Sequence, residues 1–326
     1  MIDSSPAIAT DRLTKRFGDV LALDRLTLSV PAGSVFGFLG PNGAGKTTTV
    51  RLLVGLARPT SGSATVAGLD ATMGGRALAA RIGYLDQDPR FYRWMTGRDL
   101  LELVGRLHGL AGAELRLRVG EVLELIGLEG AARRRIGGYS GGMRQRLGIG
   151  QAMLNRPSVL FLDEPVSSLD PEGRRDVLDI VERLRGVATV LLSTHILSDV
   201  ERVCDRVAIL DHGRLVTESR IDDLLELHAA PVLELDPEPG QAEPVRLLVE
   251  RLRSAPWARE VQTGHGLIRV VTADTSRAAG EILPLVAAAG VVLARFERVR
   301  PSLEDVFLRL VGAEEPPTAV PPDAAP

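Results

Sequence analysis

The sequence predicts an α/β domain built around a largely parallel sheet, followed by a smaller α+β domain. Three short apolar runs lack the alternation of a half-exposed strand, as expected of parallel strands covered on both faces. Amphipathic stretches separate these runs, and near residue 230 prolines and acidic residues interrupt the pattern. The three runs are Val35–Leu39, Pro157–Leu162 and Thr189–Ser193.

The first domain is expected to cover residues 8–225, with helices between its strands. A glycine-rich loop follows the first apolar run, and a helix is predicted to begin directly after it. Further stretches carry apolar residues at helical spacing. The predicted helices are Lys46–Leu56, Glu121–Ile126, Arg144–Leu154 and Gly173–Arg185.

The second domain is expected to cover residues 231–312. Its pattern predicts strands at Val232–Leu235 and Val291–Arg298, helices at Ala242–Arg253 and Ser276–Ala289, and two strands within Glu260–Thr272. This βαββαβ order is typical of a ferredoxin-like fold. A last helix is predicted after Ser302, which is a favoured N-cap residue followed by two acidic residues. The segment 313–326 is rich in proline and alanine, and we expect it to be disordered.

Composition excludes several classes of protein. The chain has 326 residues, 45% hydrophobic and 25% charged, and a net charge of −3, which argues against a general nucleic-acid binder. The longest apolar stretch, Ile282–Ala294, is too short to cross a membrane. The first residues do not resemble a secretory signal, and the single cysteine, Cys204, is expected to be a buried hydrophobe. We therefore expect a cytoplasmic protein without disulfides.

The glycine-rich loop predicts a triphosphate site. The chain contains two lysines, Lys15 and Lys46, among 39 basic residues, and Lys46 lies in a GxxxxGK[ST] motif. In this motif, backbone amides and the helix N-terminus bind phosphate, the lysine reaches the β- and γ-phosphates, and the following hydroxyl binds Mg²⁺. The expected nucleotide contacts are Gly40, Pro41, Asn42, Gly43, Ala44, Gly45, Lys46, Thr47 and Thr48.

Two adjacent carboxylates end the second apolar run. Asp163 and Glu164 precede Pro165, and successive strand residues point to opposite faces, so the two are expected to have different roles. Asp163 is the expected Mg²⁺ carboxylate, and Glu164 is placed to polarise a water molecule. His195 follows the third apolar run, at the sheet edge where α/β proteins bind ligands, and could reach a γ-phosphate.

A second phosphate-binding helix N-terminus is predicted at Ser140, Gly141 and Gly142, directly before a helix. One nucleotide does not need two such sites from one chain. The arrangement is explained if Ser140–Gly142 contact the ATP held by another copy.

The order of these motifs resembles the nucleotide-binding domain of an ATP-binding cassette (ABC) transporter over about residues 8–215. The resemblance implies a P-loop NTPase fold with a mixed sheet and a helical subdomain at about 88–155. It also implies Mg²⁺ held by Thr47, Asp163 and Gln87, and ATP hydrolysis by Glu164 with His195 and Gln87. Tyr139, Met143 and Ser168 depart from the commonest family residues. The remaining matches are Phe17 as the residue that stacks on adenine, Gln87 as the Q-loop glutamine, Ser140–Met143 as the signature, and Asp170 in the D-loop.

The resemblance implies two paired cassettes, as a homodimer, powering a separately encoded membrane permease at the inner face of the cell membrane. Met143 and the ending Ser302–Phe307 are similar to the branch that exports drugs, antibiotics, lipids or polysaccharides. An alternative is a soluble ABC ATPase acting on ribosomes or DNA. A GTPase is a third candidate, but no Asn-Lys-x-Asp motif is found.

Three aromatic residues, Phe91, Tyr92 and Trp94, cluster after Gln87 in a chain with 4% aromatics. The resemblance implies a groove here for a short helix of the permease. A local core cluster and base stacking on single-stranded nucleic acid are the alternatives, although no nucleic-acid partner is expected. For the domain at 231–312 we expect a role in self-association.

Overall fold

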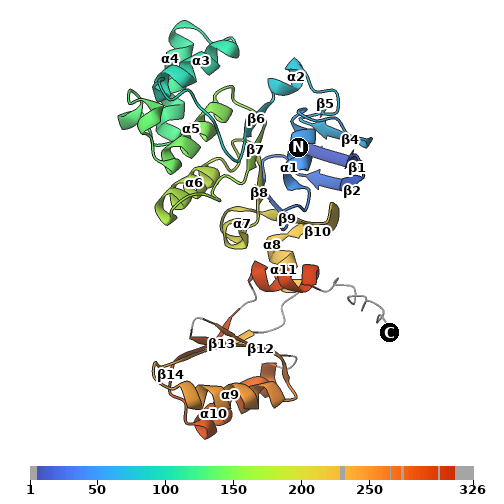
Figure 1. Cartoon of the computed structure of the whole chain (residues 1–326), viewed down its shortest axis with the longest axis vertical. Helices are drawn as coiled ribbons and strands as arrows, with labels where there is room; N and C mark the ends of the chain where they lie inside the picture. Colours follow the sequence, from blue (N-terminus) through green and yellow to red (C-terminus); the bar gives the residue numbers. More distant parts are fainter. Residues whose placement is uncertain (1–5, 228–231, 265, 273–274, 300–301, 313–326) are drawn as a thin grey trace, which may run out of the picture. The chain divides into compact units, whose positions relative to one another are not determined.

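The computed structural model describes residues 6–227, 232–264, 266–272, 275–299 and 302–312 (Figure 1). The chain divides into two compact units, Met1–Ile221 and Asp222–Pro326. The division falls at the start of helix α8 (Ile221–Leu227). The segment 313–326 and His265 lie outside the described residues.

The first unit contains a six-stranded sheet with the order β10-β9-β3-β8-β7-β6. β3, β6, β7, β8 and β9 run parallel, and β10 pairs antiparallel with β9 at one edge. All residues of β3, β7 and β8 are buried, which confirms strands covered on both faces. The strands are β3 (Val35–Leu39), β6 (Ile82–Leu85), β7 (Val159–Asp163), β8 (Thr189–Thr194), β9 (Arg206–Asp211) and β10 (Arg214–Arg220).

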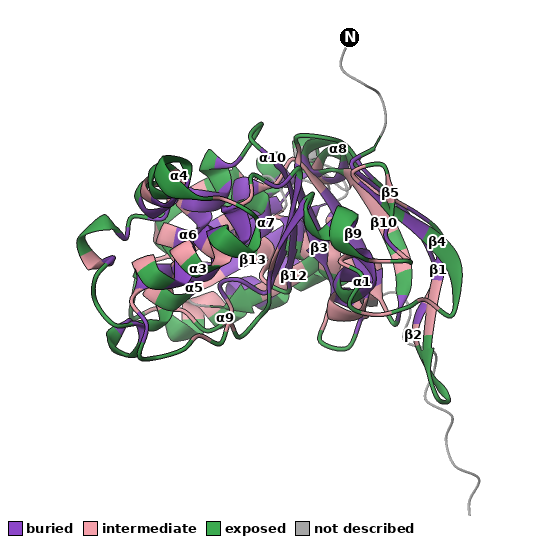
Figure 2. Ribbon diagram, turned by 90° about the horizontal axis from the view of Figure 1, so that it is seen from above, coloured by how far each residue is buried: buried purple, intermediate pink, exposed green. Residues whose placement is uncertain are grey.

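A second, antiparallel sheet has the order β2-β1-β4-β5. Its strands are β1 (Ile8–Phe17), β2 (Val20–Val30), β4 (Ser61–Val66) and β5 (Leu69–Asp70). Helix α1 (Lys46–Leu53) lies between the two sheets (Figures 1 and 2). Residues of β1, α1 and β3 such as Ile8, Val50 and Phe36 share one buried cluster. This packing holds the N-terminal end of α1 beside the carboxyl end of β3.

Several helix bounds differ from the sequence predictions, including those of the helices predicted at Arg144–Leu154 and Gly173–Arg185, which are observed at Gly141–Met153 and Pro171–Arg183. The helix predicted to reach Leu56 ends at Leu53, because the chain turns at Gly55 with a φ of 77°. The segment Glu121–Ile126 is only the second half of α4 (Gly112–Leu125). The other helices are α2 (Arg76–Ala79), α3 (Gly97–Leu107), α5 (Gly141–Met153), α6 (Pro171–Arg183) and α7 (Leu197–Val203), with short 3-10 turns at Glu129–Ala131 and Ile136–Gly138.

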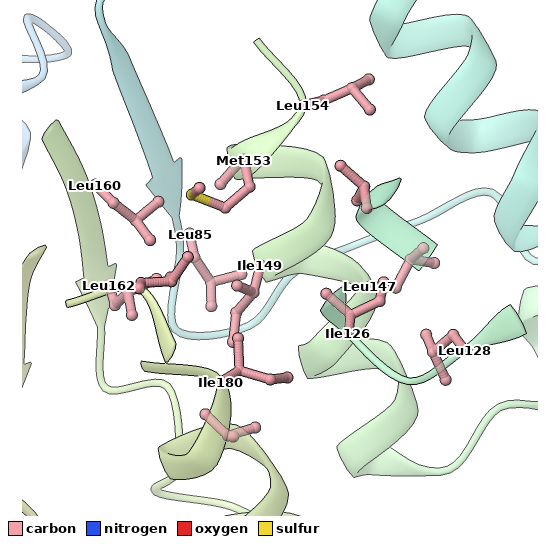
Figure 3. Close-up of a cluster of buried hydrophobic side chains, with 14 of the residues drawn as sticks. Leu85, Ile126, Leu128, Leu147, Ile149, Met153, Leu154, Leu160, Leu162 and Ile180 are labelled. Carbon is pink, nitrogen blue, oxygen red and sulfur yellow. The ribbon is translucent and has the colours of Figure 1, made fainter. Parts of the chain in front are cut away.

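Helices α3, α4 and α5 form a helical group beside the main sheet (Figure 1). Thr96 caps α3 with a reciprocal pair of hydrogen bonds to Asp99, which fixes where that helix begins. Helix α5 joins this group to the sheet, as Figure 3 shows: Ile149 and Met153 lie between β7, which carries Leu160, and Ile126 at the end of α4. Helix α5 is thus anchored in the core by the residues of its C-terminal half.

The second unit contains a four-stranded antiparallel sheet with the order β12-β13-β11-β14. Helices α9 and α10 cover one face, and Leu235, Leu252, Ile268 and Ile282 belong to the core beneath them. The predicted βαββαβ order is observed. Its elements are β11 (Val232–Pro237), α9 (Ala242–Ser254), β12 (Ala258–Gly264), β13 (Leu267–Thr272), α10 (Thr275–Ala289) and β14 (Leu293–Val299), followed by α11 (Leu303–Gly312).

Candidate functional site

The glycine-rich loop connects β3 to α1, as predicted from the sequence. Gly45 occupies the N-cap of α1 with a φ of 102°, and a Cβ there would lie 2.6 Å from the carbonyl oxygen of Ala22. Only glycine fits this position. The loop is also braced by the β9–β10 hairpin, because the amide of Gly213 donates to the carbonyl of Ala44 at 3.0 Å. Its backbone shape is therefore constrained by Ala22 of β2 and by Gly213 in the β9–β10 turn.

Lys46 is the first residue of α1 and is only 6% exposed. Its ammonium donates to the carbonyl oxygens of Gly40 at 2.7 Å and Pro41 at 3.2 Å. It also lies 3.4 Å from Oε1 of Glu164. A compact cation enclosed by two carbonyls and a carboxylate leaves little room for a planar guanidinium.

Asp163 ends β7 and is completely buried. The hydroxyl of Ser193 donates to its Oδ1, while Oδ2 has no hydrogen-bond partner. Burial raises the pKa of Asp163; hydrogen bonds from Ser193 and Thr47 oppose that rise, and the nearby Glu164 carboxylate adds to it. A buried carboxylate oxygen without a partner, beside a hydroxyl, fits a divalent cation.

Glu164 lies just beyond β7, which corrects the expectation that both carboxylates belong to the strand. Its φ is 48°, a left-handed conformation that is uncommon for a residue with a side chain. This turn, rather than strand alternation, separates the two carboxylates. Glu164 is 6% exposed, and Nδ1 of His195 lies 2.9 Å from its Oε2. His195 therefore contacts Glu164 from the end of β8.

The loop residues and Glu164 line a cavity of about 180 Å³, whereas Asp163 and His195 are not among its lining residues. Gln87 and Glu164 form part of its wall, and so does Ala22, which sequence reasoning missed because an alanine carries no chemical signal. Phe17 is not among the lining residues: it is 54% exposed at the end of β1, where the ammonium of Lys15 lies 4.7 Å from its ring centroid. The remaining lining residues are Pro41, Asn42, Gly43, Ala44, Gly45, Lys46, Thr47 and Thr48.

The second predicted phosphate site is at the N-terminus of α5. Ser140 is the N-cap and accepts a hydrogen bond from the amide of Met143 at 3.2 Å. Gly141 and Gly142 form the first turn of the helix; they do not precede it. Asp170 caps the neighbouring helix α6, accepting from the amide of Gly173 at 3.0 Å. The cavity beside the glycine-rich loop is lined by neither Ser140 nor Asp170.

The two helix starts are closely packed. A Cβ on Gly142 would lie 3.2 Å from the Cα of Gly173. Such an approach of two backbones requires glycine on both sides. The N-termini of α5 and α6 therefore form one surface, on which Ser140 and Asp170 each cap a helix.

The three aromatic residues divide between two environments. Phe91 is partly buried against the helical core and lines a groove of about 530 Å³. Gln87 and Gln151 also line this groove. Tyr92 and Trp94 are 62% and 71% exposed and do not line it. A groove is therefore present beside Gln87, and it contains one of the three aromatic residues.

Sequence reasoning missed an ion pair that joins α6 to α7. Nε of Arg174 donates to Oδ1 of Asp199 at 2.7 Å, and Asp199 is 2% exposed. Arg174 follows Asp170 by one helical turn, and Asp199 follows His195 by four residues. Neither residue belongs to a recognisable motif, so only the fold brings the two together.

The described residues hold neither a cluster of metal-binding side chains nor a membrane-spanning helix. No cluster of three or more His, Cys, Asp or Glu side chains there could hold a metal ion. A magnesium site at Asp163 would thus use one carboxylate, with hydroxyl and phosphate oxygens, as Mg²⁺ often does beside nucleotides. Within the same residues, none of the helices has the length and apolar character needed to span a membrane.

Comparison with known proteins identifies the family. Residues 23–167 match the ABC transporter family model. The chain is 38% identical to an uncharacterised ABC transporter ATP-binding protein of Bacillus subtilis, over 94% of this chain and 100% of that protein. It is 40% identical to a daunorubicin resistance ATP-binding protein of Streptomyces coeruleorubidus, over 94% and 95% of the two chains. A bacitracin transport ATP-binding protein of Bacillus licheniformis is 34% identical, over 94% and 98%.

Solved structures agree with this assignment. The ATP-binding subunit of an ABC transporter superposes with a TM-score of 0.62 at 30% identity, covering 68% of this chain and 93% of that one. An ATP-binding cassette in its ADP conformation gives a TM-score of 0.60 at 26% identity, covering 68% and 93%. The phosphate loop, the paired carboxylates and the histidine thus occur on the fold that these proteins share. This chain belongs to the ATP-binding proteins of the ABC transporter family, which are ATPases.

Proposed function

We propose that this chain hydrolyses ATP to power export of a drug, antibiotic, lipid or polysaccharide through a separate membrane permease. The observation that carries the proposal is the position of Glu164 at the phosphate-loop cavity, between Lys46 and His195. Relatives that match over nearly their full length are named for daunorubicin resistance, bacitracin transport and Nod factor export. These names favour transport over an ATPase that acts on ribosomes or DNA.

In this proposal, ATP binds with its phosphates in the cavity that Pro41–Thr48 line. Backbone amides and the N-terminus of α1 attract the phosphate oxygens. Phe17 is proposed to stack on the adenine from outside the cavity, where its exposed ring is accessible. Gln87 would contact the γ-phosphate end, since it belongs to both the cavity wall and the neighbouring groove.

The ion pair between Lys46 and Glu164 requires ATP to bind before Glu164 can accept a proton from water. A triphosphate carries more negative charge than one carboxylate, so its arrival draws the ammonium away from Glu164. Glu164 is then free to accept a proton from water while His195 holds its other oxygen. The water oxygen bonds to the γ-phosphorus, the bond to the β–γ bridging oxygen breaks, and ADP and phosphate are released.

Asp163, Thr47 and Gln87 are the residues proposed to hold Mg²⁺. When bound, the ion would neutralise phosphate charge. The unpartnered Oδ2 of Asp163 supports this assignment. Ser193 holds the other carboxylate oxygen in place, so the free oxygen has a fixed direction.

A homodimer is proposed to complete each site. Ser140, Gly141, Gly142 and Asp170 do not line the cavity of their own chain and lie at two adjacent helix N-termini. Such N-termini suit the phosphates of ATP bound by a second copy. The groove beside Phe91 is proposed to receive a permease helix, which would place the chain at the inner face of the cell membrane.

Replacement of Glu164 by Gln tests the proposal. The variant should bind ATP as the wild type does, lose turnover by about 100-fold or more, and accumulate as a dimer in ATP. Equilibrium binding, phosphate release and light scattering measure the three effects. Glu182→Gln, an exposed change on α6, serves as the control and should behave as wild type. Unchanged turnover in the Glu164 variant would remove this residue from the mechanism.

The transport role needs its own measurement. Purification of the tagged chain from its native membrane should yield a multi-span membrane protein, and that protein should raise ATP turnover when both are reconstituted. Co-purification with ribosomes in its place would favour the alternative.

A further inference from the structure

Two surface segments that are distant in sequence meet beside the helical group. The amide of Gly137 donates to the carbonyl of Arg93 at 2.9 Å, and the amide of Ile136 donates to the carbonyl of Met95 at 2.8 Å. Thr96 and Arg135 form an isolated β-bridge. These contacts bring the exposed side chains of both segments into one small region.

The first segment contributes two exposed aromatic side chains. Trp94 is 71% exposed and Tyr92 62% exposed, and their ring centroids are 5.9 Å apart. The other tryptophan, Trp257, is 2% exposed, and its indole nitrogen donates to Glu281. A soluble surface rarely displays two large aromatic rings together without a partner.

The same region contains four exposed arginines, Arg93, Arg133, Arg134 and Arg135. Among the described residues, no acidic side chain forms an ion pair with any of them. The glycines beside them leave space for the guanidiniums: a Cβ on Gly138 would lie 3.0 Å from Nε of Arg134. A chain with a net charge of −3 thus carries a local basic surface.

We call these exposed side chains the basic-aromatic patch, and its composition limits the kinds of partner that it can bind. The patch comprises Tyr92, Arg93, Trp94, Arg133, Arg134 and Arg135. None of the six lines the 530 Å³ groove or the cavity beside the phosphate loop. A peptide is usually bound in a groove and a nucleic-acid strand along a basic channel. Four exposed guanidiniums beside two exposed aromatic rings instead suit a broad anionic surface.

We propose that the basic-aromatic patch rests on the anionic headgroups of a lipid bilayer. Guanidiniums bind lipid phosphates with two hydrogen bonds, and Trp and Tyr side chains concentrate at membrane–water interfaces. The proposal adds a lipid partner to the proposed function. It rests on that function only in requiring that a membrane lies nearby. The patch adjoins the segment of Phe91, whose ring faces the groove proposed for the permease.

The test uses the purified full-length chain and lipid vesicles without any permease. Vesicles with about 30 mol % phosphatidylglycerol should sediment the protein, whereas phosphatidylcholine vesicles should not, and added salt should weaken binding. The variant R133Q/R134Q/R135Q should bind at least about 10-fold more weakly, since each charge near an anionic surface contributes severalfold. The control R76Q/R116Q/R253Q, which removes three exposed arginines elsewhere, should bind as wild type.

Tryptophan fluorescence gives a second readout. In Trp257→Phe the remaining Trp94 should shift its emission to shorter wavelength when anionic vesicles are added. In Trp94→Phe the remaining Trp257 should not shift, because it is already buried. Both variants and the triple variant should hydrolyse ATP at the wild-type basal rate, which separates this proposal from the one for Glu164.

Three results would overturn the proposal: equal sedimentation with neutral and anionic vesicles, wild-type binding by the triple variant, or no shift of Trp94. Displacement from vesicles by a single-stranded oligonucleotide at equal phosphate concentration would assign the patch to nucleic acid. Retention of an acidic permease peptide that needs the same arginines, without vesicle binding, would assign it to the permease.

Discussion

The ammonium of Lys46 lies 3.4 Å from the carboxylate of Glu164, and neither side chain is more than 7% exposed. Two such buried ions stabilise each other only while both are present, since the loss of either leaves an unpaired charge. The ion pair also holds the buried carboxylate of Glu164 in place beside the predicted phosphate site. In the proposed mechanism, charge on the incoming nucleotide replaces the charge of Glu164 as the partner of the lysine.

The two lysines of the chain provide a matched comparison. Lys46→Arg should lower ATP affinity by about 10–100-fold, because a guanidinium overpacks the space between the carbonyls of Gly40 and Pro41. Lys15→Arg keeps a partly exposed cation beside Phe17 and should bind ATP within about twofold of wild type. Titration with a fluorescent ATP analogue measures both. Equal affinities for the two variants would show that charge alone decides binding.

Asp163→Asn should stabilise the nucleotide-free protein at neutral pH by about 1 kcal/mol, or roughly 2–4 °C in melting temperature. Burial raises the pKa of Asp163, so the folded state binds a proton more tightly than the unfolded state does. The charged form therefore lowers stability as pH rises from the ordinary value of 3.8 through the raised pKa. Below both pKa values the carboxyl is neutral, and the advantage of Asn should disappear.

Thermal unfolding from pH 4 to 8 tests this relation. The same variant should lose Mg²⁺-dependent ATP turnover, because the amide cannot replace the unpartnered oxygen as a ligand. Asp176→Asn, on the partly exposed surface of α6, is the control and should show no comparable gain. A loss of stability across the whole range would mean that the charge of Asp163 is compensated in the folded protein.

Asp170 has a structural role and a proposed one, which can be separated. Asp170→Ala removes the N-cap of α6 and should lower the free energy of unfolding by about 1 kcal/mol. Asp170→Ser retains a capping oxygen and should unfold like wild type. If the carboxylate also serves the paired nucleotide site, the Ser variant should still lose ATP turnover. Full turnover in the Ser variant would limit Asp170 to capping.

Removal of residues 231–326 tests the expected self-association by the second unit. The unit has its own core around Leu235, Leu252 and Ile282, so its deletion need not expose the core of the first unit. With Glu164→Gln and ATP present, the shortened chain should form fewer dimers than the full chain at the same concentration. Sedimentation velocity measures the dimer fraction. Equal fractions, with melting temperatures unchanged, would rule out this role.

The sequence predicted the strands that carry the site because each is a continuous apolar run. The bounds predicted for Val35–Leu39 and Thr189–Ser193 needed almost no correction. A strand that is buried on both faces is apolar along its length, so the whole run is visible in the sequence. Helix ends were less accurate: the stop at Leu53 depends on the turn at Gly55. The conformation of Glu164 was not foreseen, because its positive φ has no signature in residue type.

Contacts between distant residues were the largest gap. In the pairs Ser193–Asp163 and Arg174–Asp199, the sequence singled out Asp163 alone, and the other three are ordinary polar residues in their own segments. The two interactions can be recognised only in the folded chain, where parallel strands and neighbouring helices bring the ends of the segments together. The aromatic cluster shows the same limit. Its composition indicated a partner, but only the fold separates Phe91 in the groove from Trp94 on the surface.

The hydrogen bond from the amide of Gly213 to the carbonyl of Ala44 affects when the phosphate loop can be completed during synthesis of the chain. The phosphate loop lies within the first 50 residues, yet one of its supports arrives with the hairpin between β9 and β10. Contacts of such long sequence separation form late in folding. A ribosome-bound fragment that ends before Asp211 therefore has the whole loop sequence but lacks its last brace. We therefore expect nucleotide binding to begin only when the domain is nearly fully synthesised, so that an unfinished chain leaves ATP unbound.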